Sequence, residues 1–171
     1  MRKILVLFAV LISAIIAAPA AQASPLGRLQ TRADASAQAY GIIVNRNSGR
    51  CLEVENSAGH DGARAQQWAC VGQPGAQWQL EWVSNTEFIL RNRSGKCLEI
   101  ENSWGHNGAP AQQWACVGQS GAYWHAFVRP DGWLFIVNRS GKCLEIENSN
   151  PNDGARAQQW TCEAINTMQW R

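Results

Sequence analysis

The sequence predicts an all-β protein folded as a β-trefoil, and three observations carry the prediction. First, four columns of residues keep one 46-residue step along the chain: Cys51, Cys97 and Cys143; Cys70, Cys116 and Cys162; Trp68, Trp114 and Trp160; Trp78, Trp124 and Trp170. Second, short apolar runs separated by glycine-containing turns fill each unit, and no window has a sustained helical period. Third, three copies without a divergent capping unit favour closure over an open solenoid. Three units of four short strands with pseudo-threefold symmetry correspond to a β-trefoil.

The N-terminal 23 residues have the layout of a secretory signal peptide. Arg2 and Lys3 form a basic start, an apolar run follows, and small residues lead up to Ala23. The apolar run is shorter than the roughly 20 residues that a membrane span needs, so cleavage is favoured over an anchor. We therefore expect a secreted, extracellular protein with a signal peptide at 1–23, a flexible polar lead at 24–39 and the trefoil domain at 40–171.

The second unit illustrates how each unit forms its strands. "FILRNRSGKCLEIENS" predicts an apolar strand, a turn at Gly95 and a second strand. In the second strand Leu98 and Ile100 alternate with Glu99 and Glu101, because successive side chains point to opposite faces. The apolar pair belongs in the core, so we expect the glutamates to face outward. "AQQWAC" and "AYWHAFV" predict two more short strands.

Charge and cysteine content exclude several classes of partner. Removal of Arg2 and Lys3 with the signal peptide leaves 13 basic residues against 13 acidic ones. No basic stripe is present, so we expect neither nucleic-acid binding nor membrane insertion. Six cysteines in an exported chain predict three disulfides rather than a metal site, and nothing indicates a cofactor. The sequence does not indicate the oligomeric state.

Two disulfide schemes respect the repeat. Cysteines 19 residues apart pair within each unit in the first scheme: Cys51–Cys70, Cys97–Cys116 and Cys143–Cys162. In the second scheme neighbouring units are joined, for example Cys70 to Cys97. Spacing alone does not decide between the two schemes, and we favour the first. By loop-closure reasoning each bridge would contribute roughly 3 kcal/mol.

A Gln-x-Trp motif occurs in each unit, at residues 66–68, 112–114 and 158–160. A C-L-E-V/I strand and an H/N-D/N-G turn precede it, and a cysteine follows two residues after the tryptophan. This arrangement resembles the ricin B-type lectin family, also known as carbohydrate-binding module family 13, over the whole predicted domain. The resemblance implies a β-trefoil, disulfides within each lobe and sugar binding without catalysis.

The resemblance also implies a sugar site in each lobe. The family uses an acidic residue two positions after the first cysteine, and the tryptophan of Gln-x-Trp stacks on a pyranose. The candidates here are the acids Glu53, Glu99 and Glu145, the tryptophans Trp68, Trp114 and Trp160, and the first glutamines Gln66, Gln112 and Gln158. A carboxylate accepts hydrogen bonds from neighbouring hydroxyls, and stacking would contribute about 1–2 kcal/mol. Glutamate, in place of the family's usual aspartate, moves the carboxylate outward by one methylene.

One family element is missing from this chain. The family places an Asn-Gln pair before the second tryptophan of the lobe, whereas Gly75-Ala76, Gly121-Ala122 and Thr167-Met168 stand there. Candidate substitutes nearby are Gln77, Asn166 and Gln169. The competing interpretation of the listed tryptophans and first glutamines is internal packing. Trp78, Trp124 and Trp170 are interpreted as core residues.

These observations lead to a hypothesis and an alternative. The hypothesis is a secreted lectin-like protein with up to three sites, whose partner is a polysaccharide or a cell-surface glycan. The alternative, motivated by the missing pair, is a protein-binding trefoil that has lost its sugar sites, such as an inhibitor or a toxin-associated subunit. An enzyme is disfavoured, because equivalent glutamates lie in different lobes and a glycosidase needs two carboxylates roughly 5–10 Å apart.

Overall fold

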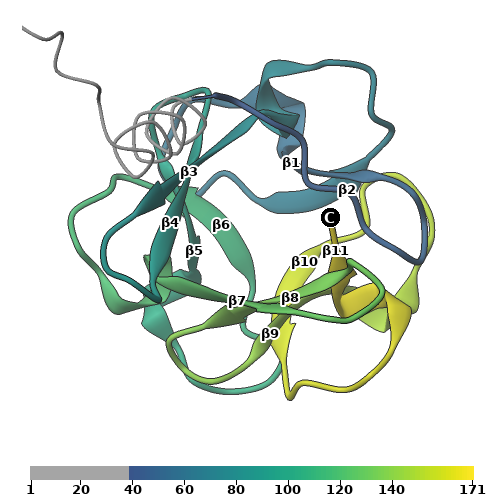
Figure 1. The fold of residues 1–171 in the computed structure, drawn as a ribbon. Coiled ribbons are helices and arrows are strands. Elements are labelled where there is room, and N and C mark those ends of the chain that lie inside the picture. Colours follow the sequence, from purple (N-terminus) through teal and green to yellow (C-terminus); the bar gives the residue numbers. More distant parts are fainter. Residues whose placement is uncertain (1–38) are drawn as a thin grey trace, which may run out of the picture.

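Each sequence unit folds as one of three lobes around a central axis (Figure 1). The computed structural model describes residues 39–171. The predicted signal peptide and the predicted lead up to residue 38 lie outside the described residues. Within the described residues the regular structure consists of strands and short 3-10 turns, which confirms the predicted all-β trefoil.

Eleven strands are present in residues 39–171. Lobe 1 contains β1 (Cys51–Val54), β2 (Ala65–Trp68) and β3 (Trp78–Trp82). Lobe 2 contains β4 (Phe88–Asn92), β5 (Cys97–Ile100), β6 (Ala111–Trp114) and β7 (Trp124–Val128). Lobe 3 contains β8 (Leu134–Asn138), β9 (Cys143–Ile146), β10 (Ala157–Trp160) and β11 (Gln169–Trp170). Short 3-10 turns follow the first strand of each Cys-Leu-Glu hairpin: Glu55–Ser57, Glu101–Ser103 and Glu147–Ser149.

The expected first strand of lobe 1 is reduced to isolated bridges. Gly41, Val44 and Asn45 each form a single antiparallel bridge instead of a continuous ladder. The Nδ2 atom of Asn45 donates to the carbonyl of Thr167 in lobe 3. Asn92 has the equivalent role in lobe 2, where its Nδ2 donates to the carbonyl of Gly75 in lobe 1. The chain has one more residue between Asn45 and its cysteine than between Asn92 and its cysteine. Gly41 therefore takes the place of Phe88, and a glycine without a side chain to pack weakens a strand.

Antiparallel pairing inside each lobe places the predicted acid directly opposite the first glutamine. β1 pairs with β2, β5 with β6 and β9 with β10. The register puts Glu53 opposite Gln66, Glu99 opposite Gln112 and Glu145 opposite Gln158. Residues directly opposite each other share one face of an antiparallel pair, so backbone pairing alone brings these side chains together.

The core contains the other face of the same strands. Leu98 and Ile100 are fully buried, as are their equivalents in the other two lobes. The second tryptophan of each lobe is also buried, and its Nε1 donates to a leucine carbonyl of the same lobe: Trp78 to Leu52 (2.9 Å), Trp124 to Leu98 (3.1 Å) and Trp170 to Leu144 (3.0 Å). A buried indole needs a partner for its N–H, and the strand supplies it. The predicted core role of these tryptophans is confirmed.

The middle glutamine of each Gln-x-Trp motif joins neighbouring lobes. Gln113 accepts a hydrogen bond from the Oγ of Ser94 (2.7 Å) and donates to the carbonyls of Ala58 (2.6 Å) and His60 (2.9 Å) in lobe 1. Gln67 donates in the same way to lobe 3, and Gln159 to lobe 2. All three glutamines are fully buried. The bonds form a closed cycle, which an open solenoid would not have.

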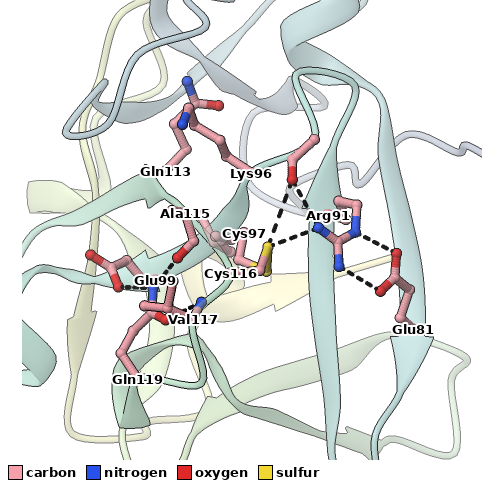
Figure 2. The surroundings of a disulfide bond; sticks show 12 residues. Glu81, Arg91, Lys96, Cys97, Glu99, Gln113, Ala115, Cys116, Val117 and Gln119 are labelled. Atoms are coloured by element: carbon pink, nitrogen blue, oxygen red, sulfur yellow. Dashed lines mark hydrogen bonds and ion pairs between the residues drawn. A yellow bond between two sulfur atoms is a disulfide. The ribbon is translucent and has the colours of Figure 1, made fainter.

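The six cysteines pair within the lobes, as in the scheme favoured from the sequence. The bridges are Cys51–Cys70, Cys97–Cys116 and Cys143–Cys162, with Cα–Cα distances of 5.2, 5.2 and 5.0 Å. Figure 2 shows the bridge of lobe 2, where Arg91 donates to Cys116 Sγ and to both carboxylate oxygens of Glu81. Each bridge ties the start of the Cys-Leu-Glu strand to the residues just after the Gln-x-Trp strand.

Two features are absent from residues 39–171. No helix there has the length and apolar character needed to cross a membrane. The same residues contain no group of three or more His, Cys, Asp or Glu side chains placed to hold a metal ion.

The middle glutamine should contribute more to stability than the glutamine beside it. Gln113→Ala removes three hydrogen bonds, leaves two carbonyls of lobe 1 without a donor and leaves the Ser94 hydroxyl without an acceptor, so we expect the free energy of unfolding to fall by about 2–4 kcal/mol. Gln112→Ala is the matched control. It removes one hydrogen bond in an open cavity that water enters, and we expect a loss of about 1 kcal/mol or less. Urea unfolding of both variants measures the difference. Equal losses of unfolding free energy would contradict the role of Gln113 in joining the lobes.

Candidate functional site

The acid of lobe 2 is held between two glutamine amides. Gln112 Nε2 donates to Glu99 Oε1 (2.9 Å), and Gln119 Nε2 donates to Glu99 Oε2 (2.6 Å). Gln119 comes from the loop after β6, and Figure 2 shows its side chain reaching Glu99. The same amide donates to the carbonyl of Ala115, and its Oε1 accepts from the N–H of Val117. The loop therefore fixes Gln119, and Gln119 fixes the carboxylate.

Lobe 1 repeats this arrangement. Gln66 Nε2 donates to Glu53 Oε1 (2.8 Å), and Gln73 Nε2 donates to Glu53 Oε2 (2.7 Å). Gln73 is tied to its own loop by Ala69 and Val71 in the same way as Gln119. Two copies of one arrangement in different lobes indicate that it is set by the repeated sequence.

The acids of the three lobes face outward as predicted, but their carboxylates are not openly exposed. Glu53, Glu99 and Glu145 are only 4, 3 and 7% exposed. They do point away from the apolar core, as strand alternation requires. The glutamine amides, however, cover the carboxylates in lobes 1 and 2, so these groups form the floor of a cavity and not an open surface.

The first tryptophan of each lobe remains accessible. Trp68, Trp114 and Trp160 are 41, 40 and 37% exposed. In lobe 2 the indole and the acid line one cavity of about 330 Å³, together with Asn102, Ser103, Gln112, Val117 and Gln119. The equivalent cavity of lobe 1 has about 220 Å³ and is lined by Glu53, Asn56, Ser57, Gln66, Trp68, Val71 and Gln73. Acid, first glutamine and indole thus meet in both lobes.

Close backbone packing leaves no space for the family's asparagine in lobes 1 and 2, whereas Thr167 stands at that position in lobe 3. That asparagine would stand at Gly121, where an added Cβ would lie 2.5 Å from the carbonyl oxygen of Ile100. Gly75 has the same close approach in lobe 1, to Val54. Only glycine fits there. None of the candidate substitutes replaces the asparagine: Gln77 and Gln169 donate to carbonyls of their own loops, and no bond joins Asn166 to the acid of its lobe.

The 3-10 turn after β5 supplies a further polar group. Asn102 has a φ of +51°, and Ser103 next to it has a φ of +54°. Asparagine tolerates this left-handed region better than most residues. The Oγ of Ser103 accepts from the N–H of Gly121 (2.8 Å), which holds the turn against the loop. The exposed amide of Asn102 has no hydrogen-bond partner among the described residues and lines the cavity.

The neighbouring lobe borders each cavity. Gly62 of lobe 1 has a φ of +81°, and a Cβ there would lie 3.8 Å from Trp114 Cζ3. Next to it, Asp61 accepts from the N–H of Ala115 (2.8 Å) and from Lys96 Nζ (2.7 Å). The hydrogen bond from Lys96 lowers the pKa of Asp61. The H/N-D/N-G turn therefore positions the Gln-x-Trp strand of the next lobe.

Lobe 3 departs from this arrangement at three consecutive positions, two of which change the surroundings of the acid. Ile165 stands where Gln73 and Gln119 stand, and Glu163 replaces the valine. Glu145 keeps a single amide partner, Gln158 (2.7 Å). Burial raises the pKa of Glu145, partly opposed by this hydrogen bond, and the nearby carboxylates of Glu163 and Glu147 raise it further.

Comparison with known proteins assigns the chain to a protein family. The model of the ricin-type β-trefoil lectin domain matches residues 39–170. The chain belongs to this family. Membership of this lectin family supports carbohydrate binding in general. Some of the structurally similar proteins are glycosidases that contain such a domain.

Solved structures resemble this ricin-type lectin domain to different extents. The designed threefold-symmetric protein ThreeFoil is 34% identical with a TM-score of 0.75, over 77% of this chain and 96% of that chain. The exo-β-1,3-galactanase 1,3Gal43A of Clostridium thermocellum is 26% identical with a TM-score of 0.76, over 78% of this chain and 30% of the galactanase chain. The Rhizoctonia solani agglutinin, 18% identical with a TM-score of 0.68 over 77% and 91% of the two chains, shares the fold. Among curated protein sequences none matches.

Sequence reasoning missed Gln73 and Gln119, which hold the acid. Both occupy the same column of the repeat, in the sequence "VGQ", and lobe 3 reads "EAI" there. The occurrence of this glutamine in two of the three lobes was the signal in the sequence that could have identified it. Asn56 and Asn102 were missed as well, because they belong to a repeated "ENS" whose left-handed turn does not follow from strand alternation.

The raised pKa of Glu145 predicts a pH-dependent stability difference. A folded pKa above the unfolded one favours folding while the group is protonated, and this contribution is lost as the pH rises through the folded pKa. Relative to the wild type, Glu145→Gln should therefore gain stability as the pH increases from 4 to 7. Urea unfolding at several pH values measures this difference.

Glu99→Gln is the control for this comparison. It replaces one acceptor oxygen of a clamped carboxylate by an amide that faces an amide donor, so we expect a loss of about 1–2 kcal/mol near neutral pH. If the stabilities of the two variants, each relative to the wild type, changed in parallel with pH, the interpretation that Glu145 in lobe 3 causes the pH dependence would be contradicted.

Proposed function

We propose that this protein is a secreted, non-enzymatic lectin that binds sugars of a polysaccharide or of a cell-surface glycan, chiefly through lobes 1 and 2. The observation that carries this proposal is the cavity shared by a clamped carboxylate and an exposed indole in each of these lobes. Family membership supports the general activity. The three disulfides fit an oxidising compartment, which supports the expected secretion.

The clamped acid suits recognition of sugar hydroxyls. Each carboxylate oxygen of Glu99 accepts one amide hydrogen bond, and a carboxylate has about four acceptor positions in total. Capacity therefore remains for two neighbouring hydroxyl groups. Because the amides fix the side chain before the sugar arrives, binding loses less side-chain entropy. The exposed face of Trp114 provides an apolar surface for a pyranose ring, and Asn102 adds an unpaired amide.

The cavities contain too few acids for a glycosidase mechanism. Each of the cavities of lobes 1 and 2 has one carboxylate in its lining. Hydrolysis of a glycosidic bond generally uses two carboxylates, an acid and a base or nucleophile. Weak single sites on one rigid body would instead gain affinity by engaging several units of a polymer.

The protein-binding alternative keeps two supporting observations. Gln73 and Gln119 hold the acids in lobes 1 and 2, whereas the asparagine with which the family bonds the sugar is absent, an absence that motivates the alternative. Four large apolar side chains are also exposed near the tips of the β3–β4 and β7–β8 hairpins: Trp82, Val83, Phe127 and Val128. Capture of a protein that free sugar does not displace, combined with a negative glycan array, would favour this alternative.

Loss of one indole should remove one site. A glycan array identifies the sugar, and calorimetric titration with the corresponding mono- or disaccharide counts the sites. We expect Trp114→Ala to remove the site of lobe 2, because stacking worth about 1–2 kcal/mol lowers affinity roughly tenfold or more when lost. Trp68→Ala with Trp114→Ala should abolish most binding.

Trp104→Ala is the control, since Trp104 is equally exposed (41%) but lines neither cavity. An unchanged affinity and number of sites after the double change would refute the sites.

Restoring the clamp should improve lobe 3. Ile165→Gln with Glu163→Val gives lobe 3 the residues of lobes 1 and 2 at these positions. In a background with Trp68→Ala and Trp114→Ala, we expect these two changes to increase the affinity of the remaining lobe about tenfold, the effect of one charge-assisted hydrogen bond. Glu163→Val alone serves as the control. An unchanged affinity would mean that the clamp does not determine binding.

A further inference from the structure

A third polar cavity lies at the junction of lobes 3 and 1. It has a volume of about 380 Å³ and is lined by Arg64, Glu147, Asn148, Asn150, Gly154, Ala155 and Arg156. None of these residues lines the cavities of lobes 1 and 2 that contain an acid and an indole. The cavity is therefore a separate feature of the surface.

Backbone pairing places two arginines on the same face of this junction. Gln66 and Arg156 form an antiparallel bridge, so their side chains point to the same side. Arg64 lies two residues before Gln66 in extended backbone and shares that side as well. Both guanidinium groups accordingly border one cavity.

At each junction one residue pairs with the first glutamine of the neighbouring lobe, and another stands two residues before that glutamine. Within residues 39–171, the junction of lobes 3 and 1 is the one of the three that has arginine at both of these positions. The bridge between lobes 1 and 2 pairs Arg64 with Gln112, and Pro110 stands two residues before that glutamine. The bridge between lobes 2 and 3 pairs Pro110 with Gln158. Pro110 thus interrupts the arginine pair at the other two junctions.

The arginine pair has unused hydrogen-bonding capacity. No hydrogen bond or ion pair joins the exposed guanidinium of Arg156 to another described residue. Arg64 uses only Nη2, which donates to Gln66 Oε1 (2.9 Å) and to Glu55 Oε1 (3.2 Å), and its Nε is buried without an acceptor. Glu147 contributes one carboxylate to the lining against the two guanidinium groups. Arg64 is already paired with Glu55, so Arg156 is the unpaired cation of the lining, and its planar donors suit an oxyanion.

We propose that this junction binds the carboxylate or sulfate group of an acidic sugar. The proposal rests on the proposed lectin function in one respect: Gln66 bonds both Arg64 and Glu53, so the arginine pair is one side chain away from the acid of lobe 1. A polymer with its neutral unit in lobe 1 would place a neighbouring acidic unit at the arginines. The substrate class is then a polysaccharide that carries uronic acid or sulfate substituents.

Three polymers with one backbone test the proposal. Immobilised dextran, carboxymethyl dextran and dextran sulfate differ only in charge and in the kind of anion, so the second and third distinguish carboxylate from sulfate. We expect Arg156→Gln to weaken binding to at least one charged polymer about tenfold. Lys142→Gln, the control, removes the same charge outside the cavity and should leave binding within about twofold. Pro110→Arg restores an arginine pair at both other junctions and should strengthen binding.

Titration with inorganic sulfate separates this proposal from the lectin proposal. Nitrogen-15 NMR should show shifts of the Arg64 and Arg156 Nε–H signals, and Arg156→Gln should abolish the Arg64 shift. Sulfate responses with a negative glycan array would support the anion site and refute the sugar sites. Equal losses for Arg156→Gln and Lys142→Gln, or no response of either arginine to sulfate, would overturn the anion site whatever the array shows.

Discussion

The buried middle glutamine of Gln-x-Trp is the constraint on which the rest of the structure depends. Gln113 and its equivalents are fully buried between two lobes, where an unpaired amide would be costly, and each makes three side-chain hydrogen bonds. Because side chains alternate along a strand, an inward Gln113 obliges Gln112 and Trp114 to face outward together. Strand pairing then puts Glu99 opposite Gln112. The interaction that closes the trefoil thus also assembles acid, amide and indole on the outer surface of each lobe.

Those parts of the structure that follow from periodicity were predictable from the sequence. The 46-residue step predicted the threefold fold, and alternation predicted that Leu98 enters the core while Glu99 turns away from it. Alternation states only the side to which a residue points, however, and not what covers it. The buried state of Glu99 depends on Gln119, a loop residue 20 positions later whose approach follows from the tight packing of Gly121. Contacts of this kind are set by tertiary structure and have no local pattern.

Identical scaffolding in the three lobes leaves the cavities free to differ. The middle glutamines, the disulfides and the core tryptophans make equivalent contacts in each lobe. Ile165 and Glu163 change the surroundings of the acid in lobe 3, and Pro110 changes two of the three junctions, without altering those contacts. A substitution in a cavity or at a junction therefore affects recognition more than folding, so pseudo-symmetry of the fold does not imply three equal sites.

In lobes 1 and 2 the missing asparagine goes with one packing arrangement. Gly75 and Gly121 bring the loop backbone within contact distance of the 3-10 turn, which leaves no space for a side chain at the family's asparagine position. The amide that supports the acid comes from Gln73 or Gln119, two residues earlier in the same loop. A glutamate has an extra rotatable bond compared with aspartate, and fixing it costs side-chain entropy. Two amide donors offset that cost in lobes 1 and 2. In lobe 3 one of them is absent, and burial is the dominant influence on Glu145, which accounts for its raised pKa.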